Sequence, residues 1–281
     1  MSDPAYVAAR RVLLEALDAL HDHLASIVLV GAQAIYLRTQ DSRLRSAPYT
    51  TDGDLAINPR LLVPEPELAA TMAAAGFSRE PSGPRAPQPG LWYKAATVGG
   101  IESEVEIDLL VPQASLPHGS ERGARLPNHS PSASRLVPGI EAALVDFSPM
   151  SIAALEDDDP RSVSCNVAGV AALVVAKLHK LEDRLAAPGD ANRRLDAKDA
   201  GDLVRLFLAT DATLMRTTLR RLQNEPIAGP VTTAALESLT KLFGGRRTPG
   251  TSLAIRALEA DLPAAQVEVI CIEFAQSVSR P

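Results

Sequence analysis

Two aspartates separated by one glycine stand directly before a short apolar segment in the stretch TTDGDLAIN, residues 50–58. In an extended strand the side chains alternate, so Asp52 and Asp54 project from one face, about 7 Å apart, and Leu55 and Ile57 from the other. Carboxylates placed together at the edge of a core repel each other unless a cation neutralises them. The stretch therefore suggests a metal site, and the alternative is a polar turn before a strand.

A second strand, ESEVEIDLLVP at residues 102–112, repeats this pattern. Its acidic face carries Glu104, Glu106 and Asp108, and its opposite, apolar face carries Val105, Ile107 and Leu109. If the two strands are neighbours in one sheet, Asp108 joins Asp52 and Asp54. Three carboxylates with open coordination positions suit Mg²⁺, with Mn²⁺ as the alternative, holding the phosphates of a nucleotide. The sequence thus predicts Asp52, Asp54 and Asp108 as metal ligands.

Several elements must position these acids. The segment IVLVG at residues 27–31, which follows Ser26, predicts a buried strand that ends at Gly31. A helix is predicted to begin directly after it, with AQAIYLRT. The pattern also predicts helices over 5–25 and 64–77, the second with prolines in its first turn, and strands at 91–98 and 102–112. Two long loops, at 78–90 and 112–138, complete this part of the chain. Loops of this length are typical of functional or disordered segments.

From Val167 onward the pattern becomes helical, which predicts a boundary near residue 165. We therefore expect an α+β fold with one domain over residues 1–165 and a helical domain over residues 166–281. The chain has 281 residues, of which 46% are hydrophobic, enough for a sizeable core. Its apolar runs are about half as long as a bilayer span requires, and it has two cysteines, so we expect a cytoplasmic protein without membrane association.

The formal charge of −6 argues against broad, nonspecific nucleic-acid binding, but it leaves room for a local basic site. Arginines gather before the two aspartates and in the second long loop, and they are the candidates for such a site: Arg43, Arg45, Arg122 and Arg125. On the helix predicted over 168–185, Lys180 and Arg184 are neighbours that repel each other unless an anion lies near. They are further candidates for phosphate contacts.

Lys177 falls in the middle of the apolar stripe of that same helix, and Asp199 opens the next helix beside an apolar face. A buried lysine opposite a carboxylate is either a structural ion pair or a site in which the lysine neutralises phosphate. The residues by themselves leave both interpretations open.

The order VLVGAQAIYL, TTDGDLAI and VEIDLLV resembles the signature of the nucleotidyltransferase superfamily, and within it the AbiEii/MenT group of toxin–antitoxin systems. The likeness covers both halves of the chain, because that group also has a lysine followed by a Lys-Asp pair, here Lys177 and Lys198-Asp199. It differs at Ala32, where the group has a phosphate-binding serine, and at Gly53, where an apolar residue is usual. The resemblance implies a mixed sheet flanked by helices, followed by a helical bundle that contributes to the active-site cleft.

The resemblance also implies an activity: transfer of nucleotides from a nucleoside triphosphate to the 3′ end of tRNA, which blocks aminoacylation and translation. The expected catalytic residues are Asp52, Asp54, Asp108, Lys177 and Asp199. Nucleotide binding would involve Gly31, Ala32, Lys177 and Lys180, and RNA binding Arg43, Arg45, Arg122, Arg125 and Arg184. A cognate antitoxin protein is the expected partner.

Two other functions fit the same residues. One is a nucleotidyltransferase that acts on a small molecule or a protein hydroxyl, although the long loops are basic rather than aromatic and acidic. The other is a nucleotide-binding or partner-binding module without turnover, which the missing serine at Ala32 favours.

Overall fold

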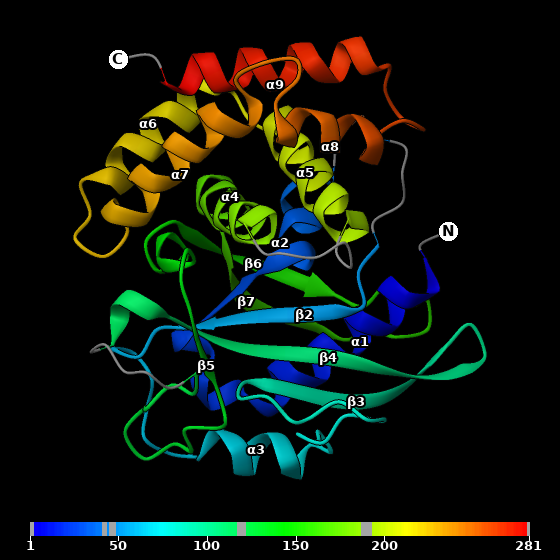
Figure 1. Cartoon of the computed structure of the whole chain (residues 1–281). Coiled ribbons are helices and arrows are strands. Elements are labelled where there is room, and N and C mark those ends of the chain that lie inside the picture. The colour runs from blue at the N-terminus through cyan, green and yellow to red at the C-terminus, as the bar shows by residue number, and fades with distance from the viewer. Residues whose placement is uncertain (1–2, 41–43, 45–48, 117–121, 187–192, 280–281) are drawn as a thin grey trace. The chain divides into compact units, whose positions relative to one another are not determined.

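The computed structural model describes residues 3–40, 44, 49–116, 122–186 and 193–279, and its fold is α+β (Figure 1). The strands are β1 (Ile27–Val30), β2 (Asp52–Ile57), β3 (Leu91–Val98), β4 (Ile101–Pro112), β5 (Arg135–Val137), β6 (Phe147–Ala153) and β7 (Ser162–Ala168). The helices are α1 (Pro4–Ala19), α2 (Gly31–Arg38), α3 (Leu68–Ala74), α4 (Val170–Ala186), α5 (Arg193–Leu208), α6 (Ala212–Gln223), α7 (Gly229–Phe243), α8 (Pro249–Ala257) and α9 (Ala264–Ser279), with short 3-10 turns at His21–Ser26, Gln113–Ser115 and Glu141–Leu144.

The seven strands form one mixed sheet in the order β3-β4-β2-β1-β7-β6, with β5 paired to β4. Strand β2 runs antiparallel to β1 and parallel to β4. Strands β3 and β4 form one hairpin, and β6 and β7 form another. The prediction that the two acidic strands are neighbours is therefore confirmed.

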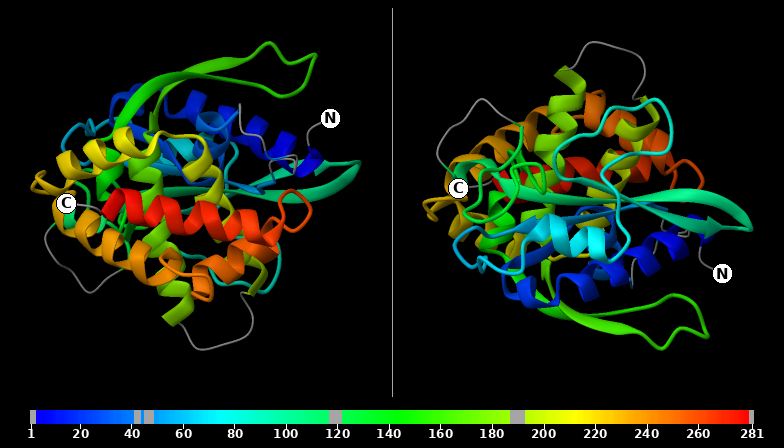
Figure 2. Two further views of the ribbon diagram at one scale, coloured as in Figure 1. Left: turned by 90° about the horizontal axis from the view of Figure 1, so that it is seen from above. Right: turned by 90° about the horizontal axis from the view of Figure 1, so that it is seen from below.

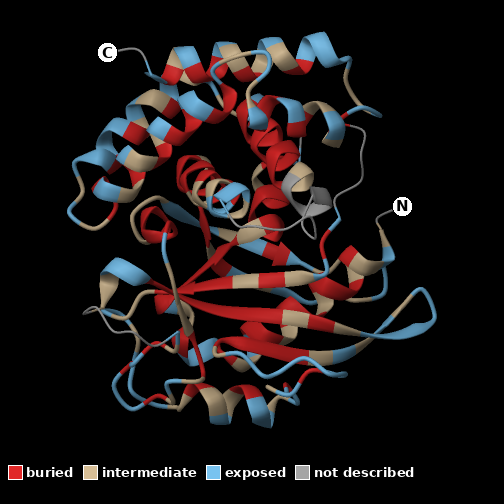
Figure 3. Ribbon diagram, in the orientation of Figure 1, coloured by how far each residue is buried: buried red, intermediate tan, exposed pale blue. Residues whose placement is uncertain are grey.

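Helix α1 packs against one face of this sheet, on β2, β3, β4 and β7. A Cβ atom on Gly53 would lie 2.9 Å from Ile107 and 3.3 Å from Leu13 of α1. The Gly53 and Ile107 side of β2 and β4 is thus the apolar, helix-covered face. Because side chains alternate along a strand, Asp52, Asp54 and Asp108 belong to the opposite face. In Figure 3 the C-terminal half of each of these two strands has the colour of buried residues.

Two helices are shorter than the sequence pattern predicts. The first ends at Ala19, and a 3-10 turn over His21–Ser26 replaces the expected continuation to residue 25. Helix α3 begins at Leu68 rather than at residue 64, because Glu67 caps it by accepting from the N–H of Ala70 at 2.7 Å. The prolines expected in its first turn precede the helix instead.

Strands β6 and β7 are absent from the sequence-based expectation. A signal for β7 exists, because Val163, Cys165 and Val167 alternate with polar residues. Strand β6 gives a weaker signal, since Pro149 lies inside it and proline is confined to sheet edges. Figure 2 shows the pair as a long hairpin beside α1.

The chain divides into two compact units that are not continuous in sequence. One comprises residues 1–34, 47–138 and 147–168 and contains the sheet; the other comprises residues 35–46, 139–146 and 169–281. Within the second unit α4 packs on α5 and α7, and α9 packs on α5 and α6. Its core includes Phe207 stacked on Phe274 at a centroid distance of 3.9 Å. Among the described residues, no helix has the length and apolar character needed to cross a membrane.

Candidate functional site

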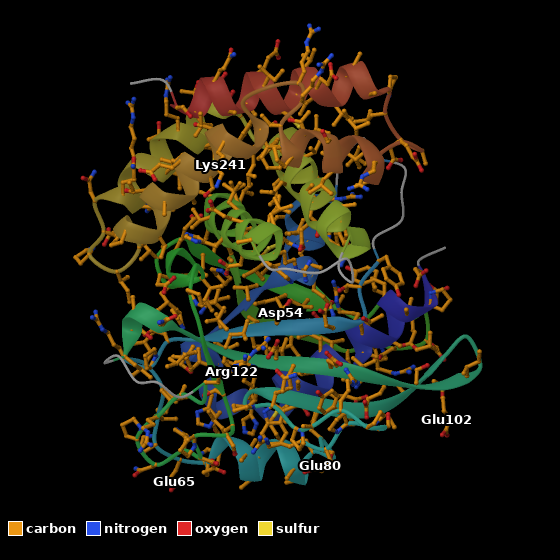
Figure 4. All side chains as sticks on the ribbon, in the orientation of Figure 1. Asp54, Glu65, Glu80, Glu102, Arg122 and Lys241 are labelled. Atoms are coloured by element: carbon orange, nitrogen blue, oxygen red, sulfur yellow. The ribbon has the colours of Figure 1, made fainter. Side chains whose placement is uncertain are left out.

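The carboxylates of the sheet unit are brought together by strand register. In the parallel pairing of β2 with β4, Asp54 is the partner of Asp108, and Asp52 is the partner of Glu106. Residues paired in this way point to the same face of a sheet. Figure 4 labels Asp54 on β2. The sequence pattern predicted the face on which each acid lies, and the pairing of the strands places Asp54 beside Asp108.

Asp108 is a buried acid with a strongly perturbed pKa. Only 7% of its surface is exposed, and burial raises its pKa to about 7, with the neighbouring carboxylates of Asp54 and, more weakly, Asp52 acting in the same direction. The guanidinium of Arg135, which donates to Oδ2, opposes this rise. Within the described part of the chain, the buried Oδ1 atom of Asp108 has no hydrogen-bond partner.

Carboxylate oxygens gathered on one face of a sheet are ligands that a divalent cation prefers. The orphaned Oδ1 of Asp108, beside Asp54, is open to a proton or to a hard cation. Asp52 is engaged differently, because the hydroxyl of Thr50 donates to its Oδ1. No group of three or more His, Cys, Asp or Glu side chains in the described residues is arranged to hold a metal ion. Asp52, Asp54 and Asp108 as metal ligands therefore stay a prediction.

Gly31 makes room for the carboxylate of Asp54. Its φ of +68° lies in the left-handed region, and a Cβ atom at this position would overlap Asp54 Oδ2. The turn from β1 into α2 can approach Asp54 this closely because the residue is glycine. The next residue, Ala32, is buried at 5% exposure and supplies no hydroxyl.

The helical unit contains a separate buried charge cluster, built by helical spacing. Lys177 and Arg184 are seven residues apart on α4, and Asp199 and Asp202 are three apart on α5, so each pair shares a face. Lys177 Nζ lies 2.5 Å from Asp199 Oδ1 and 2.8 Å from Asp202 Oδ2. Arg184 donates to Asp199 Oδ2. Two cations thus balance two carboxylates.

The electrostatics of this cluster favour its charged form. Burial alone lowers the pKa of Lys177, but Asp202 and Asp199 outweigh it and raise the pKa above its usual value. Burial raises the pKa of Asp199, and the cations Lys177, Lys180 and Arg184 outweigh that effect and lower it. Lys177 forms ion pairs with Asp199 and Asp202 in this structure.

No protein-family model and no curated protein matches this sequence. The residues of the site therefore carry the assignment of function.

The remaining predicted contacts fall in several places. Arg122 and Arg125 are exposed in the loop after β4, where Figure 4 labels Arg122, and Lys180 is exposed on α4. Arg184, predicted to contact phosphate or RNA, is bound to Asp199. Arg43 and Arg45 lie outside the described residues.

Three participants were missed in the sequence. Asp202 carries a usable signal, since it follows Asp199 by three residues on the same helix face. Thr50 stands two residues before Asp52, an ordinary spacing for a local side-chain hydrogen bond. Arg135 has no local signal as the partner of Asp108, because 27 residues separate the two.

Proposed function

We propose that this protein is a magnesium-dependent nucleotidyltransferase that transfers nucleotides from a nucleoside triphosphate to the 3′ end of tRNA. The observation that carries the proposal is the pairing of Asp54 with the buried Asp108, whose Oδ1 atom lacks a partner among the described residues. Burial of an incompletely satisfied carboxylate beside a second one is unfavourable for stability, and such arrangements are concentrated at functional sites.

The reaction joins the 3′ oxygen of the acceptor to the α-phosphorus and breaks the bond between that phosphorus and the pyrophosphate oxygen. Asp108 accepts the hydroxyl proton at Oδ1, a role suited to a carboxylate whose pKa is about 7. Asp52 and Asp54 would hold magnesium; when bound, the metal would supply charge neutralisation for the triphosphate. Gly31 keeps the turn into α2 close to Asp54, where backbone N–H groups at a helix start favour phosphate.

The tRNA acceptor is supported by the exposed Arg122 and Arg125 in the loop after β4 and by the resemblance of the sequence to the AbiEii/MenT toxins. A chain of net charge −6 needs such a local basic region to bind a polyanion. A toxin of this kind would block aminoacylation and require a cognate antitoxin protein.

Incorporation of label tests this proposal. The protein is incubated with Mg²⁺, total tRNA and each of the four labelled nucleoside triphosphates in turn. The wild type should label RNA at its 3′ end, Asp54→Ala should not, and Asp18→Ala, which removes an exposed acid of α1, should match the wild type. Label in a small molecule or in protein, with none in RNA, would show that the acceptor assignment is wrong.

A second candidate function is a nucleotide-binding module without turnover. The ion pair of Asp108 with Arg135 and the alanine at position 32, which supplies no phosphate-binding hydroxyl, favour it. Saturable binding of a triphosphate, with no incorporation under any acceptor or metal condition, would identify this alternative.

A further inference from the structure

Arg10 of α1 is a buried cation in the sheet unit. Its residue surface is 2% exposed, and each of its three nitrogens donates a hydrogen bond. Nε bonds Gln33 Oε1 at 2.8 Å, Nη1 bonds the carbonyl of Ala153 at 3.0 Å, and Nη2 bonds the hydroxyl of Tyr6 at 2.8 Å. The guanidinium therefore joins α1 to α2 and to the end of β6.

All three acceptors are neutral. No carboxylate among the described residues lies within ion-pair distance of Arg10, whereas the adjacent Arg11 pairs with Glu156 at 2.6 Å. A buried guanidinium without a counter-ion is unfavourable for stability, and replacing such a charge by a well-packed apolar side chain is often neutral or stabilising. Stability alone does not account for this residue.

Arg10 fixes the orientation of Gln33, which is itself 1% exposed. Because Oε1 accepts from the guanidinium, the amide nitrogen faces the other way, and Nε2 donates to the backbone carbonyl of Asp52 at 3.2 Å. The pairing of β1 with β2 ends at Val30 and Asp54, so Asp52 lies beyond the last ladder partner on that side. Gln33 supplies the donor that β1 no longer provides.

We propose that Arg10 and Gln33 are positioning residues that hold the first residues of β2, and with them the carboxylates of Asp52 and Asp54, in place for the reaction. This inference rests on the proposed function for its kinetic consequence, but the clamp on Asp52 can be measured without any activity. Gln33 belongs to α2, the helix that begins at Gly31, so the clamp also fixes the helix start relative to the strand that bears the acids.

Two substitutions separate positioning from packing. Arg10→Met removes the unpaired charge and keeps the volume, which offsets the loss of the donor to three acceptors, so the fold should melt close to the wild-type temperature. Gln33→Glu gives Arg10 a counter-ion but takes the donor away from Asp52, so this variant should also keep its melting temperature. The matched control is Arg11→Met. Arg11 is the next residue in the sequence, and it has its own ion pair with Glu156 in the β6–β7 hairpin.

The experiment combines thermal melting, hydrogen exchange followed by mass spectrometry, and steady-state kinetics on the full chain. In Arg10→Met and Gln33→Glu, peptides covering residues 50–57 should exchange about tenfold faster than in the wild type, while β4 peptides stay unchanged. Their kcat should fall by on the order of 10- to 100-fold, with KM within about twofold, as expected when reacting groups are misplaced. Arg10→Lys should recover part of both losses.

If residues 50–57 exchange at the wild-type rate in both variants, Arg10 and Gln33 do not hold Asp52 in place, and this conclusion would not depend on the measured kcat or KM. Faster exchange with normal kcat would overturn the positioning role. If the wild type transfers no nucleotide at all, the proposed function fails, and the exchange measurement still decides whether Arg10 and Gln33 hold Asp52. A lower melting temperature for Arg10→Met with unchanged exchange and kcat would identify Arg10 as a packing residue.

Discussion

Asp54 and Asp108 are direct partners in the parallel pairing of β2 and β4, although they are 54 positions apart along the chain. Burial, with the Asp54 carboxylate acting in the same direction, raises the pKa of Asp108 to about 7. The relationship places a group that can accept a proton beside one that can bind a cation. A single substitution at Asp108 would remove the proton acceptor, and a single substitution at Asp54 would remove the cation ligand.

Asp54→Asn should abolish nucleotide transfer and leave the fold at least as stable. The substitution removes the charge that repels Asp108, so the free energy of unfolding should stay level or rise by about 1 kcal/mol. Urea denaturation at pH 8 measures the stability, and label incorporation measures the transfer. In cells, induced expression of the wild type should arrest growth, and Asp54→Asn at matched expression should not. Equal arrest by both chains would sink the claim that chemistry causes it.

Lys177→Met should destabilise the protein by about 3–5 kcal/mol, because it leaves Asp199 and Asp202 buried without the lysine, and Arg184 is paired with Asp199 alone of the two. The control is Lys180→Met, which changes an exposed lysine one turn away on α4 that acts on Asp199 more weakly than Lys177 does, and it should lower the melting temperature far less. A Lys177→Met protein that is as stable as the wild type but inactive would instead support the phosphate-binding role. Near-normal activity would exclude Lys177 from the site.

Gly31→Ala should lose activity out of proportion to stability. Both Gly31, at φ +68°, and Gly99, at φ +56°, are in the left-handed region, so alanine at either should cost about 1–2 kcal/mol. A Cβ atom at Gly99 meets nothing within 4 Å, whereas at Gly31 it displaces the carboxylate of Asp54. Denaturation curves for the two variants should therefore be similar, and transfer should be lost in Gly31→Ala alone. Full activity of Gly31→Ala would show that the position of Asp54 is not critical.

His23 should make the fold sensitive to acid. It is 1% exposed, and burial lowers its pKa, with His129 and His21 acting in the same direction and the carbonyl of Pro66 and Asp22 opposing them. Since the folded-state pKa lies below the unfolded value, stability is complete above pH 6.5 and is lost as the pH falls through the folded pKa. The slope from this group is at most about 1.4 kcal/mol per pH unit.

Comparing His23→Gln with the wild type isolates the pH dependence of the free energy of unfolding that His23 contributes. Glutamine can keep a donor toward the Pro66 carbonyl, which His23 Nε2 contacts at 2.8 Å, but it cannot be protonated. The free energy of unfolding, measured in urea at pH 7.5 and pH 5.5, should fall less in His23→Gln than in the wild type. His21→Gln changes an exposed ring and should behave as the wild type does. Parallel losses in wild type and His23→Gln would exclude His23 as the source.

The sequence by itself determined which side chains share a face. Alternation puts Asp52 and Asp54 on one side of a strand, and the 3.6-residue repeat puts Lys177 in the apolar stripe of its helix, because these relationships depend on local backbone geometry. The strand before Gly31, the helix after it and the hairpin of β3 and β4 were predictable for the same reason. The predicted α+β class agrees with the mixed sheet and its helices.

The interaction partner of each of these side chains follows only from the tertiary structure. Arg135 reaches Asp108 across 27 residues, Gln33 reaches the Asp52 carbonyl across 19, and Lys177 finds both Asp199 and Asp202 on another helix. Such pairings depend on strand order and helix packing, which no local repeat encodes. Local periodicity thus fixed the direction of each acid and base, and the long-range packing of the chain fixed what neutralises it.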